Sequence, residues 1–205
     1  MLAFFKANVI SLSLGDDWQF DSSGVFLLGK SQIGPDLALR GTPTPLIKAT
    51  ALGRAGVFNS TLSNSNTTFG TTAIGVPLSV WGLFAPNALP HTESYGTVCR
   101  GNPHVNDSAW VCNDATGTSN LYNGYGTKYR DNSATIAMST TPSVYRSDNP
   151  SNTDSGIACC GYGVGLGPGG GAAGIHLGEM CLSIIPSAGQ AAEATAVLLR
   201  YLNRQ

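Results

Sequence analysis

The sequence predicts an all-β fold, either a sandwich or a barrel, that ends in one amphipathic helix. Three observations support this prediction: many turn-forming residues, a series of short apolar runs between them, and a capped apolar stripe near the C-terminus. The 205 residues include 26 glycines and 11 prolines, and only 11% are charged, against about a quarter in an average domain. A chain of this length can form one β domain with a substantial core.

Short apolar runs between turn-forming clusters are interpreted as strands. The run 76–86 (VPLSVWGLFAP) has apolar side chains at both alternating sets of positions, so we expect a central strand covered on both faces. Asn123-Gly124, between aromatic residues, predicts a tight hairpin turn. The polar stretch 59–72 is expected at the surface as a long loop or an edge strand. The other expected strands cover residues 24–29, 55–60, 95–101, 109–113, 134–138 and 155–165.

The C-terminal segment combines a strand and a helix. Residues 174–185 (GIHLGEMCLSII) form a strand-like run that ends at Pro186. Ser187 then occupies an N-cap position, and Gln190 completes an S-x-x-Q capping box. We expect the helix to dock against the edge of the β scaffold or on a neighbouring molecule. Its apolar stripe follows the i, i+3, i+4, i+7, i+8 pattern and consists of Ala194, Val197, Leu198, Tyr201 and Leu202.

This segment resembles the C-terminal signature of LamG-like, concanavalin A-like domains of the lectin and glucanase group. The resemblance is carried by G-x-x-L-G-E-M-x-L at 174–182, by a following helix that contains Glu193, and by Tyr-Leu at 201–202. VPLSVWGLFAP is similar to an early central strand of that family, and LYNG at 121–124 is similar to its LYVNG hairpin but one residue short. The resemblance implies a two-sheet antiparallel jelly-roll sandwich with one short C-terminal helix. We therefore expect an N-terminal arm at 1–20 and a single jelly-roll domain at 21–205.

The same resemblance bears on catalysis. The glucanases of this fold use E-x-D-x-x-E on one strand, which places a nucleophile, a helper and an acid on a single face. Here Glu179 is followed by Cys181 and Ile184 at the other two positions. The resemblance thus implies a structural role for Glu179, and we expect no enzymatic activity and no catalytic residues.

Two further patterns do not support catalysis or phosphate binding. The glycine-rich stretch 161–174 contains G-x-G-x-x-G, but Pro168 lies inside it and a strand rather than a helix follows, so we interpret it as a loop. His91, His104 and His176 are far apart in the sequence, and no G-x-S-x-G accompanies them.

Five cysteines occur at positions 99, 112, 159, 160 and 181. No C-x-x-C pair is present, so we expect no zinc site. Reduced thiols are the default expectation for a chain without an export signal. A disulfide bond between Cys99 and Cys112 across a hairpin remains a hypothesis for oxidising conditions.

A sugar site needs aromatic faces for stacking, with amides and carboxylates to meet the hydroxyls. The loop-rich stretch 102–129 supplies both, although these aromatic residues would equally suit a core or a subunit interface. The candidate carbohydrate-binding residues are Asn106, Asp107, Trp110, Asn113, Tyr122 and Tyr125.

One stretch of the sequence has residue types that suit a calcium site. LamG-like domains often hold calcium, and the stretch 146–156 gathers oxygen ligands of the type that it prefers. The spacing matches no defined calcium loop, and the same residue types also form turns, so both interpretations stay open. The candidate ligands are Asp148, Asn149, Asn152 and Asp154.

Charge and hydropathy limit the partners. The net charge of −1 and the absence of a Lys/Arg cluster argue against nucleic acid. The sequence contains no run of about 18 uncharged apolar residues, so we expect no membrane span. Lys6 interrupts the apolar N-terminal run, so we expect no signal peptide.

These features lead to two expected functions. The first is a non-enzymatic virion protein, for instance of a phage: a decoration, fibre or tail component assembled in the host cytoplasm. It would contact other virion subunits or copies of itself and would bind surface polysaccharide. The alternative is a stand-alone carbohydrate-binding module of a cell-surface or secreted system.

Overall fold

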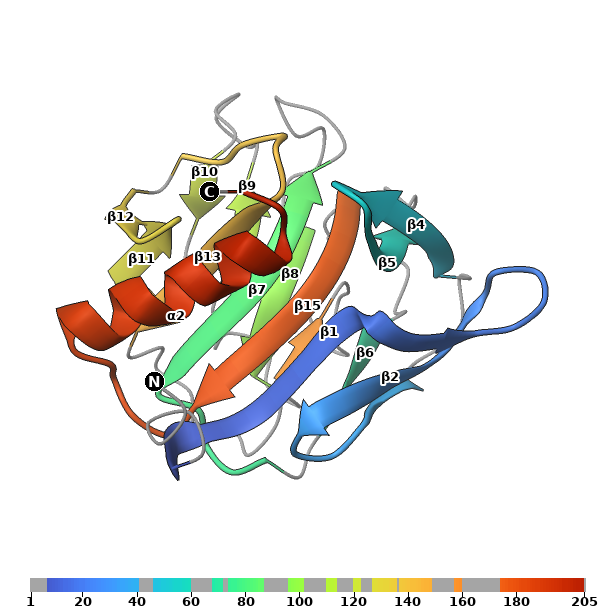
Figure 1. Cartoon of the computed structure of the whole chain (residues 1–205), viewed down its shortest axis with the longest axis horizontal. Helices are drawn as coiled ribbons and strands as arrows, with labels where there is room; N and C mark the ends of the chain where they lie inside the picture. Colours follow the sequence, from blue (N-terminus) through green and yellow to red (C-terminus); the bar gives the residue numbers. More distant parts are fainter. Residues whose placement is uncertain are drawn as a thin grey trace.

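The computed structural model describes residues 7–40, 46–59, 68–71, 74–86, 96–101, 110–113, 120–122, 127–135, 137–148, 157–159 and 174–204. In these residues the fold is mostly β, with one helix at the C-terminal end (Figure 1). The strands are β1 (Val9–Phe20), β2 (Phe26–Ile33), β3 (Leu37–Arg40), β4 (Ile47–Ala51), β5 (Arg54–Asn59), β6 (Thr68–Thr71), β7 (Ser79–Pro86), β8 (Gly96–Gly101), β9 (Trp110–Asn113), β10 (Asn120–Tyr122), β11 (Thr127–Arg130), β12 (Ser133–Ala134), β13 (Ser143–Asp148), β14 (Ile157–Cys159) and β15 (Gly174–Leu182), and the helix is α2 (Ala188–Tyr201).

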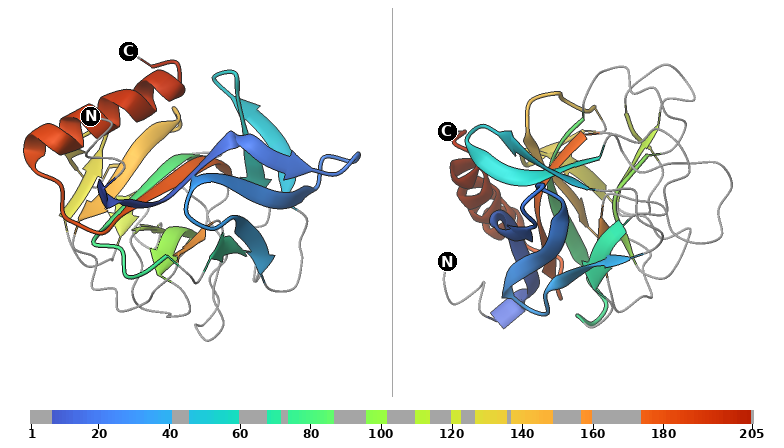
Figure 2. Two further views of the ribbon diagram at one scale, coloured as in Figure 1. Left: turned by 60° about the horizontal axis from the view of Figure 1, so that its bottom comes forward. Right: turned by 90° about the vertical axis from the view of Figure 1, so that its right-hand side faces the viewer.

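The strands form one large antiparallel sheet. Its order is β10-β9-β8-β14-β6-β3-β2-β1-β15-β7-β13-β11-β12, and β4 joins through β5, which pairs with β15. Figure 2 shows α2 and the short strands β8 and β9 on opposite sides of the layer that contains β1, β15 and β7. The all-β prediction with one C-terminal helix is therefore confirmed for the described residues.

Strand β7 is the central strand that the sequence predicts. It lies between β15 and β13, and all of its residues are buried. Trp81 and Leu83 face one hydrophobic cluster, whereas Val80 and Phe84 belong to another. Both faces of the sheet are thus covered at β7, which explains why its sequence lacks polar alternation.

The N-terminal segment requires a correction. We expected residues 1–20 to form an arm, but residues 9–20 form β1, which pairs with β15 on one edge and β2 on the other. The pattern S-L-S-L alternates from Ser11, with Ser11 and Ser13 on one face and Leu12 and Leu14 on the other. Both serines are fully buried, so small polar residues at these positions concealed a strand inside the sheet.

Two other segments differ from the expectation. Among the described residues of the predicted strand 134–138, Ala134 alone belongs to a strand, β12, which pairs with β11 at the end of the sheet. Within 59–72, residues 68–71 form β6 between β3 and β14, so β6 is neither a loop nor an edge strand. Thr71 is only 6% exposed. The prediction from the polar composition of 59–72 is therefore wrong for β6, because Thr and Gly also fit inside a paired sheet.

Helix α2 begins where the sequence predicts. The Ser187 side chain accepts a hydrogen bond from the Gln190 backbone N–H, and the Gln190 side chain accepts one from the Ser187 N–H. This reciprocal pair satisfies two otherwise unpaired donors at the helix start. The predicted stripe is buried at Ala194, Leu198 and Leu202.

The docking position of α2 differs from the prediction. The helix packs on the face of the sheet over β7, β13 and β15, not against its edge (Figure 1). The face is broad because strands β13, β7 and β15 present apolar side chains in register. Those buried side chains are Trp81, Leu83, Val144, Leu177, Met180 and Leu182.

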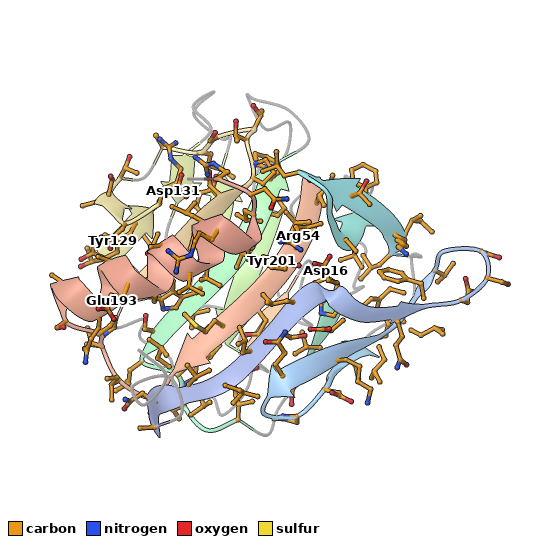
Figure 3. The ribbon with its side chains drawn as sticks, viewed as in Figure 1. Asp16, Arg54, Tyr129, Asp131, Glu193 and Tyr201 are labelled. Carbon is orange, nitrogen blue, oxygen red and sulfur yellow. The ribbon has the colours of Figure 1, made fainter. Side chains whose placement is uncertain are left out.

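Polar contacts hold the C-terminal end of α2 in place. The Arg54 guanidinium pairs with Asp16 (2.9 Å), donates to the backbone carbonyl of Tyr201, and lies 4.6 Å from the centre of the Tyr201 ring. Arg204 pairs with Asp131 (2.9 Å) beyond the helix end. Figure 3 shows Asp16, Arg54 and Tyr201 converging at this end of α2. Two ion pairs, Arg54–Asp16 and Arg204–Asp131, therefore attach the C-terminal end of the helix to the sheet scaffold.

We predict that Leu198→Ala destabilises the protein by about 2–5 kcal/mol, because it removes a side chain that is 4% exposed from the helix–sheet cluster. Leu199→Ala is the matched control: it makes the same change in helix propensity at a neighbouring, only partly buried position. Urea unfolding followed by circular dichroism measures both. Equal losses for the two variants would contradict the observed packing of α2.

Candidate functional site

A pocket of about 340 Å³ lies where the start of α2 faces strands β11 and β13. Polar residues from the sheet line one side, and the segment that leads into the helix lines the other. This volume falls within the range of small-molecule sites. The lining residues are Thr127, Tyr129, Asn132, Arg146, Asp148, Ile185, Pro186 and Ala188.

A two-residue turn brings Asn132 to the pocket. Asp131 and Asn132 both have positive φ (49° and 66°), and Arg130 pairs with Ser133 across them. This is the pattern of a type I′ hairpin turn, in which Asn and Asp tolerate the left-handed region. Asp131 also accepts a hydrogen bond from the Val144 N–H (2.9 Å), which fixes the turn against β13.

Arg146 forms the polar base of the pocket. Its guanidinium carbon lies 3.8 Å from the centre of the Tyr129 ring and 5.1 Å from that of Trp81. Nη1 donates to Oδ1 of Asn132 (3.0 Å). Because the side chain is only 6% exposed, the two aromatic rings and the polar contacts together compensate for its lost hydration.

Asp148 balances the charge of Arg146. Oδ2 lies 3.2 Å from Nε of Arg146, an ion pair whose angle falls short of a hydrogen bond. Oδ1 accepts a hydrogen bond from the Ser79 hydroxyl (2.6 Å). Burial raises the pKa of Asp148, while Ser79 and Arg146 act in the opposite direction. The pocket therefore contains one cation and one carboxylate in contact, with no excess of positive charge among its lining residues.

This arrangement suits an uncharged polar ligand. Sugar hydroxyls both donate and accept hydrogen bonds, and the pocket offers a carboxylate, an amide, a hydroxyl and a guanidinium. Tyr129 supplies an aromatic surface, and Ile185, which is 49% exposed, supplies an apolar one. Figure 3 shows Tyr129 on the β11 side of the sheet, close to α2.

A second group of polar side chains lies inside the sheet around Glu179, on β15. Glu179 is fully buried. The Ser11 hydroxyl donates to its Oε1 (2.6 Å), and the Cys181 thiol lies 3.4 Å from its Oε2. Burial raises the pKa of Glu179 to about 7, against the smaller opposite effect of these two hydrogen bonds. The Glu179 carboxyl is therefore enclosed within the sheet.

His176 and Lys128 are also buried titratable groups. Burial lowers the pKa of His176 to about 3, and its ring stacks on Trp18 with 6.1 Å between ring centres. Burial likewise lowers the pKa of Lys128 to about 7. Lys128 donates to the Ser147 hydroxyl (2.6 Å), but Ser147 is fully buried and so is not exposed for nucleophilic attack.

Half of the predicted carbohydrate-binding residues lie outside the described part of the chain. Asn106, Asp107 and Tyr125 lie outside it. Trp110 and Asn113 are the end residues of β9, and Tyr122 ends β10, which pairs with β9. The prediction for these residues stays a prediction.

The candidate calcium ligands are similarly divided. Asp148 is on β13 and its carboxylate contacts Ser79 and Arg146, whereas Asn149, Asn152 and Asp154 lie outside the described residues. The predicted Asn123-Gly124 turn also lies outside them. Among the described residues, no group of three or more His, Cys, Asp or Glu side chains is placed to hold a metal ion.

The strand register bears on the Cys99–Cys112 hypothesis. Strands β8 and β9 pair antiparallel, but Cys112 is opposite Gly96 and Cys99 is opposite Trp110. The register also shifts between Thr97 and Cys99, so the two cysteines are not directly opposite each other. Cys181 is a buried free thiol.

No known protein family, curated protein or solved structure matches this chain. In the part of the chain that is described, no helix has the length and apolarity to cross a membrane.

Sequence analysis missed the pocket residues Tyr129, Asn132 and Arg146. One local signal was available: Asp131-Asn132 between Tyr-Arg and Ser-Ala has the composition of a type I′ hairpin turn. No comparable signal indicates that Arg146 packs against Tyr129, because that contact depends on the pairing of β11 with β13. The α2 side of the pocket depends on tertiary packing alone.

We predict that Glu179→Gln changes how stability depends on pH. Because the pKa of Glu179 is raised from 4.5 to about 7 in the folded state, its contribution is fully present below pH 4.5 and is lost as the pH rises to 7. Each pKa unit corresponds to about 1.4 kcal/mol. Glutamine keeps the acceptor for Ser11 without titrating. The wild-type protein should therefore lose about 3 kcal/mol relative to the variant between pH 4 and pH 8.

The measurement is urea unfolding of both proteins at several pH values in this range. His176 contributes with the opposite sign, since its lowered pKa removes stability as the pH falls below 6.5. Subtracting the variant from the wild type cancels this contribution. A difference that stays constant with pH would show that Glu179 is not buried as the structure has it.

Proposed function

We propose that this protein is a non-enzymatic carbohydrate-binding module with a jelly-roll sandwich fold, and that it serves as a structural and adhesion protein of a virion. The observation that carries the binding function is the pocket in which Tyr129, Asn132, Arg146 and Asp148 converge beside α2. The jelly-roll assignment is supported by the antiparallel sheet, the central strand β7 and the capped helix after β15. These agree with the LamG-like resemblance.

The charge balance of the pocket favours a neutral saccharide. Arg146 and Asp148 pair with each other, so neither charge is available in excess to select an ionic ligand. A saccharide unit can place an apolar ring face near Tyr129 or Ile185 and direct its hydroxyls to Asn132 and Asp148. The proposed ligand is a polysaccharide of a host cell surface.

A non-enzymatic role agrees with the arrangement of carboxylates. Glycoside hydrolysis requires two carboxyl groups on either side of the scissile bond. Among the described residues that line the pocket, Asp148 is the only carboxylate, and Glu179 is fully buried in the sheet. The pocket as described supports binding rather than hydrolysis.

We predict that Tyr129→Ala weakens saccharide binding by about tenfold or more, which corresponds to about 1.4 kcal/mol of lost stacking. Tyr129→Phe is the matched control, because it keeps the ring against Arg146 and lacks only the hydroxyl. A glycan array of microbial surface polysaccharides identifies a ligand for the wild type, and calorimetric titration then compares the three proteins. Circular dichroism verifies their fold.

Two results would contradict the binding proposal. One is the absence of any wild-type signal above background on the array. The other is equal affinity of all three proteins for a ligand that the wild type binds, which would move the site away from Tyr129. Such a result would direct attention to the predicted residues of 102–129.

The virion role requires contacts between subunits. Exposed apolar side chains gather on the β2–β3 side of the sheet. Leu27 is 52% exposed and Leu39 is 39% exposed, and they flank the register pair Leu28–Ala38, so they lie on one face. Ile47, 40% exposed, is opposite Val25 on the same side. We propose this apolar surface as the contact with a neighbouring copy or another virion subunit.

We predict that the purified protein forms oligomers and that Leu27→Ser shifts the population toward monomer. Burying about 100 Å² of leucine surface contributes on the order of 2–3 kcal/mol to association. Val76→Ser, at another exposed position, is the control and should leave the assembly unchanged. Analytical ultracentrifugation measures both. A wild-type protein that stays monomeric at all concentrations, yet binds saccharide, would favour the stand-alone carbohydrate-binding module instead.

A further inference from the structure

Cys99 and Cys159 occupy opposite positions on two neighbouring strands. Strands β8 and β14 pair antiparallel, with Cys159 opposite Cys99 and Ile157 opposite Gly101. The other edge of β14 pairs with β6, where Cys159 is opposite Phe69. The register of β14 is therefore defined on both of its edges.

This backbone register fits the geometry of a disulfide bond. Residues that are directly opposite in an antiparallel pair have Cα atoms about 4.5 or 5.5 Å apart, depending on the type of pair. Disulfide bonds span Cα separations of about 4.4–6.8 Å. Directly opposite residues also lie on the same face of a sheet. Cys99 and Cys159 meet both requirements for either type of pair.

The alternative partner of Cys99 is less favourable. Cys99 is opposite Trp110 and Cys112 is opposite Gly96, and the register shifts between Thr97 and Cys99, so the two cysteines are out of register by at least two residues. Even in a regular ladder, residues two out of register are about 7–8 Å apart, at or beyond the limit of about 7 Å for a disulfide without backbone movement. Strand register thus selects Cys159 over Cys112, although the sequence alone suggested the Cys99–Cys112 hairpin.

We propose that Cys99 and Cys159 form a disulfide bond between β8 and β14 when the protein meets an oxidising environment. The oxidant is a small-molecule disulfide such as oxidised glutathione. One cysteine thiolate attacks it and releases a first glutathione thiolate, and the second cysteine then attacks the mixed disulfide and releases the other. The two cysteines together lose two protons and two electrons, and one glutathione disulfide becomes two thiols.

The bond would connect positions that are distant in sequence. It closes a loop of about 60 residues, and cross-links that close long loops restrict the unfolded chain most. It also joins β8, with β9 and β10 beyond it, to the rest of the sheet through β14. Disulfide bonds persist on virion and cell surfaces and are uncommon in reducing cytoplasm. The proposal goes beyond the proposed function and does not depend on saccharide binding.

Peptide mapping of the full chain tests the bond directly. The protein is equilibrated in a buffer of oxidised and reduced glutathione, its free thiols are alkylated with iodoacetamide, and the digest is analysed by mass spectrometry without reduction. We expect a linked pair of peptides that contain Cys99 and Cys159. Reduction with dithiothreitol should lower Tm by on the order of 10 °C.

Two variants provide the controls. Cys112→Ser should keep both the linked peptide and the fall in Tm on reduction, whereas Cys159→Ser should lose both. A Cys99–Cys112 linkage in the wild type, or full alkylation of Cys99 and Cys159 after oxidation, would overturn the proposal. Because the wild-type map needs no variant, it decides the question even if a variant fails to fold. Neither peptide mapping nor the Tm measurement depends on saccharide binding. The disulfide proposal and the proposed function can therefore be contradicted independently of each other.

Discussion

The packing of α2 on the face of β7 and β15 is the contact on which the rest of the structure depends. β7 is apolar on both faces and β15 is apolar on the face that α2 covers, so without the helix that face would be exposed to water. Ala194, Leu198 and Leu202 provide that cover. The same docking brings the residues before and at the helix start against β11 and β13, where they form one side of the pocket. Stability and the candidate site therefore share a cause.

Polar groups inside the sheet impose a second constraint. Glu179 and His176 are both fully buried, and burial moves their pKa values in opposite directions, up for the acid and down for the base. Both groups are thus favoured in neutral form inside the fold. Arg146, in contrast, has partners around its charge: two aromatic rings, Asn132 and Asp148. Burial thus disfavours the charged forms of Glu179 and His176 in the sheet interior, whereas the charge of Arg146 beside the pocket is paired with Asp148.

Local signals in the sequence predicted the elements that local chemistry determines. Ser187 and Gln190 identified the helix start, and the composition of 76–86 identified a strand buried on both faces. Prediction failed where polar residues occupy buried positions. Ser11 and Ser13 concealed β1, because their burial depends on Glu179, Trp18 and the backbone carbonyl of Lys30 as hydrogen-bond partners. The pocket could not be predicted because β11, β13 and α2 meet only through tertiary packing.

The pocket beside the paired Arg146 and Asp148 requires that the helix remain docked, since Ile185, Pro186 and Ala188 line the opposite side. The most direct test of this account is native-state hydrogen exchange of the full chain, resolved by residue. It predicts that backbone amides in the middle of α2 exchange with the same free energy as those of β7 and β15, in one cooperative unit. Amides of α2 that exchange at much lower free energy than those of β7 and β15 would show that the helix separates from the sheet on its own, and would contradict the account.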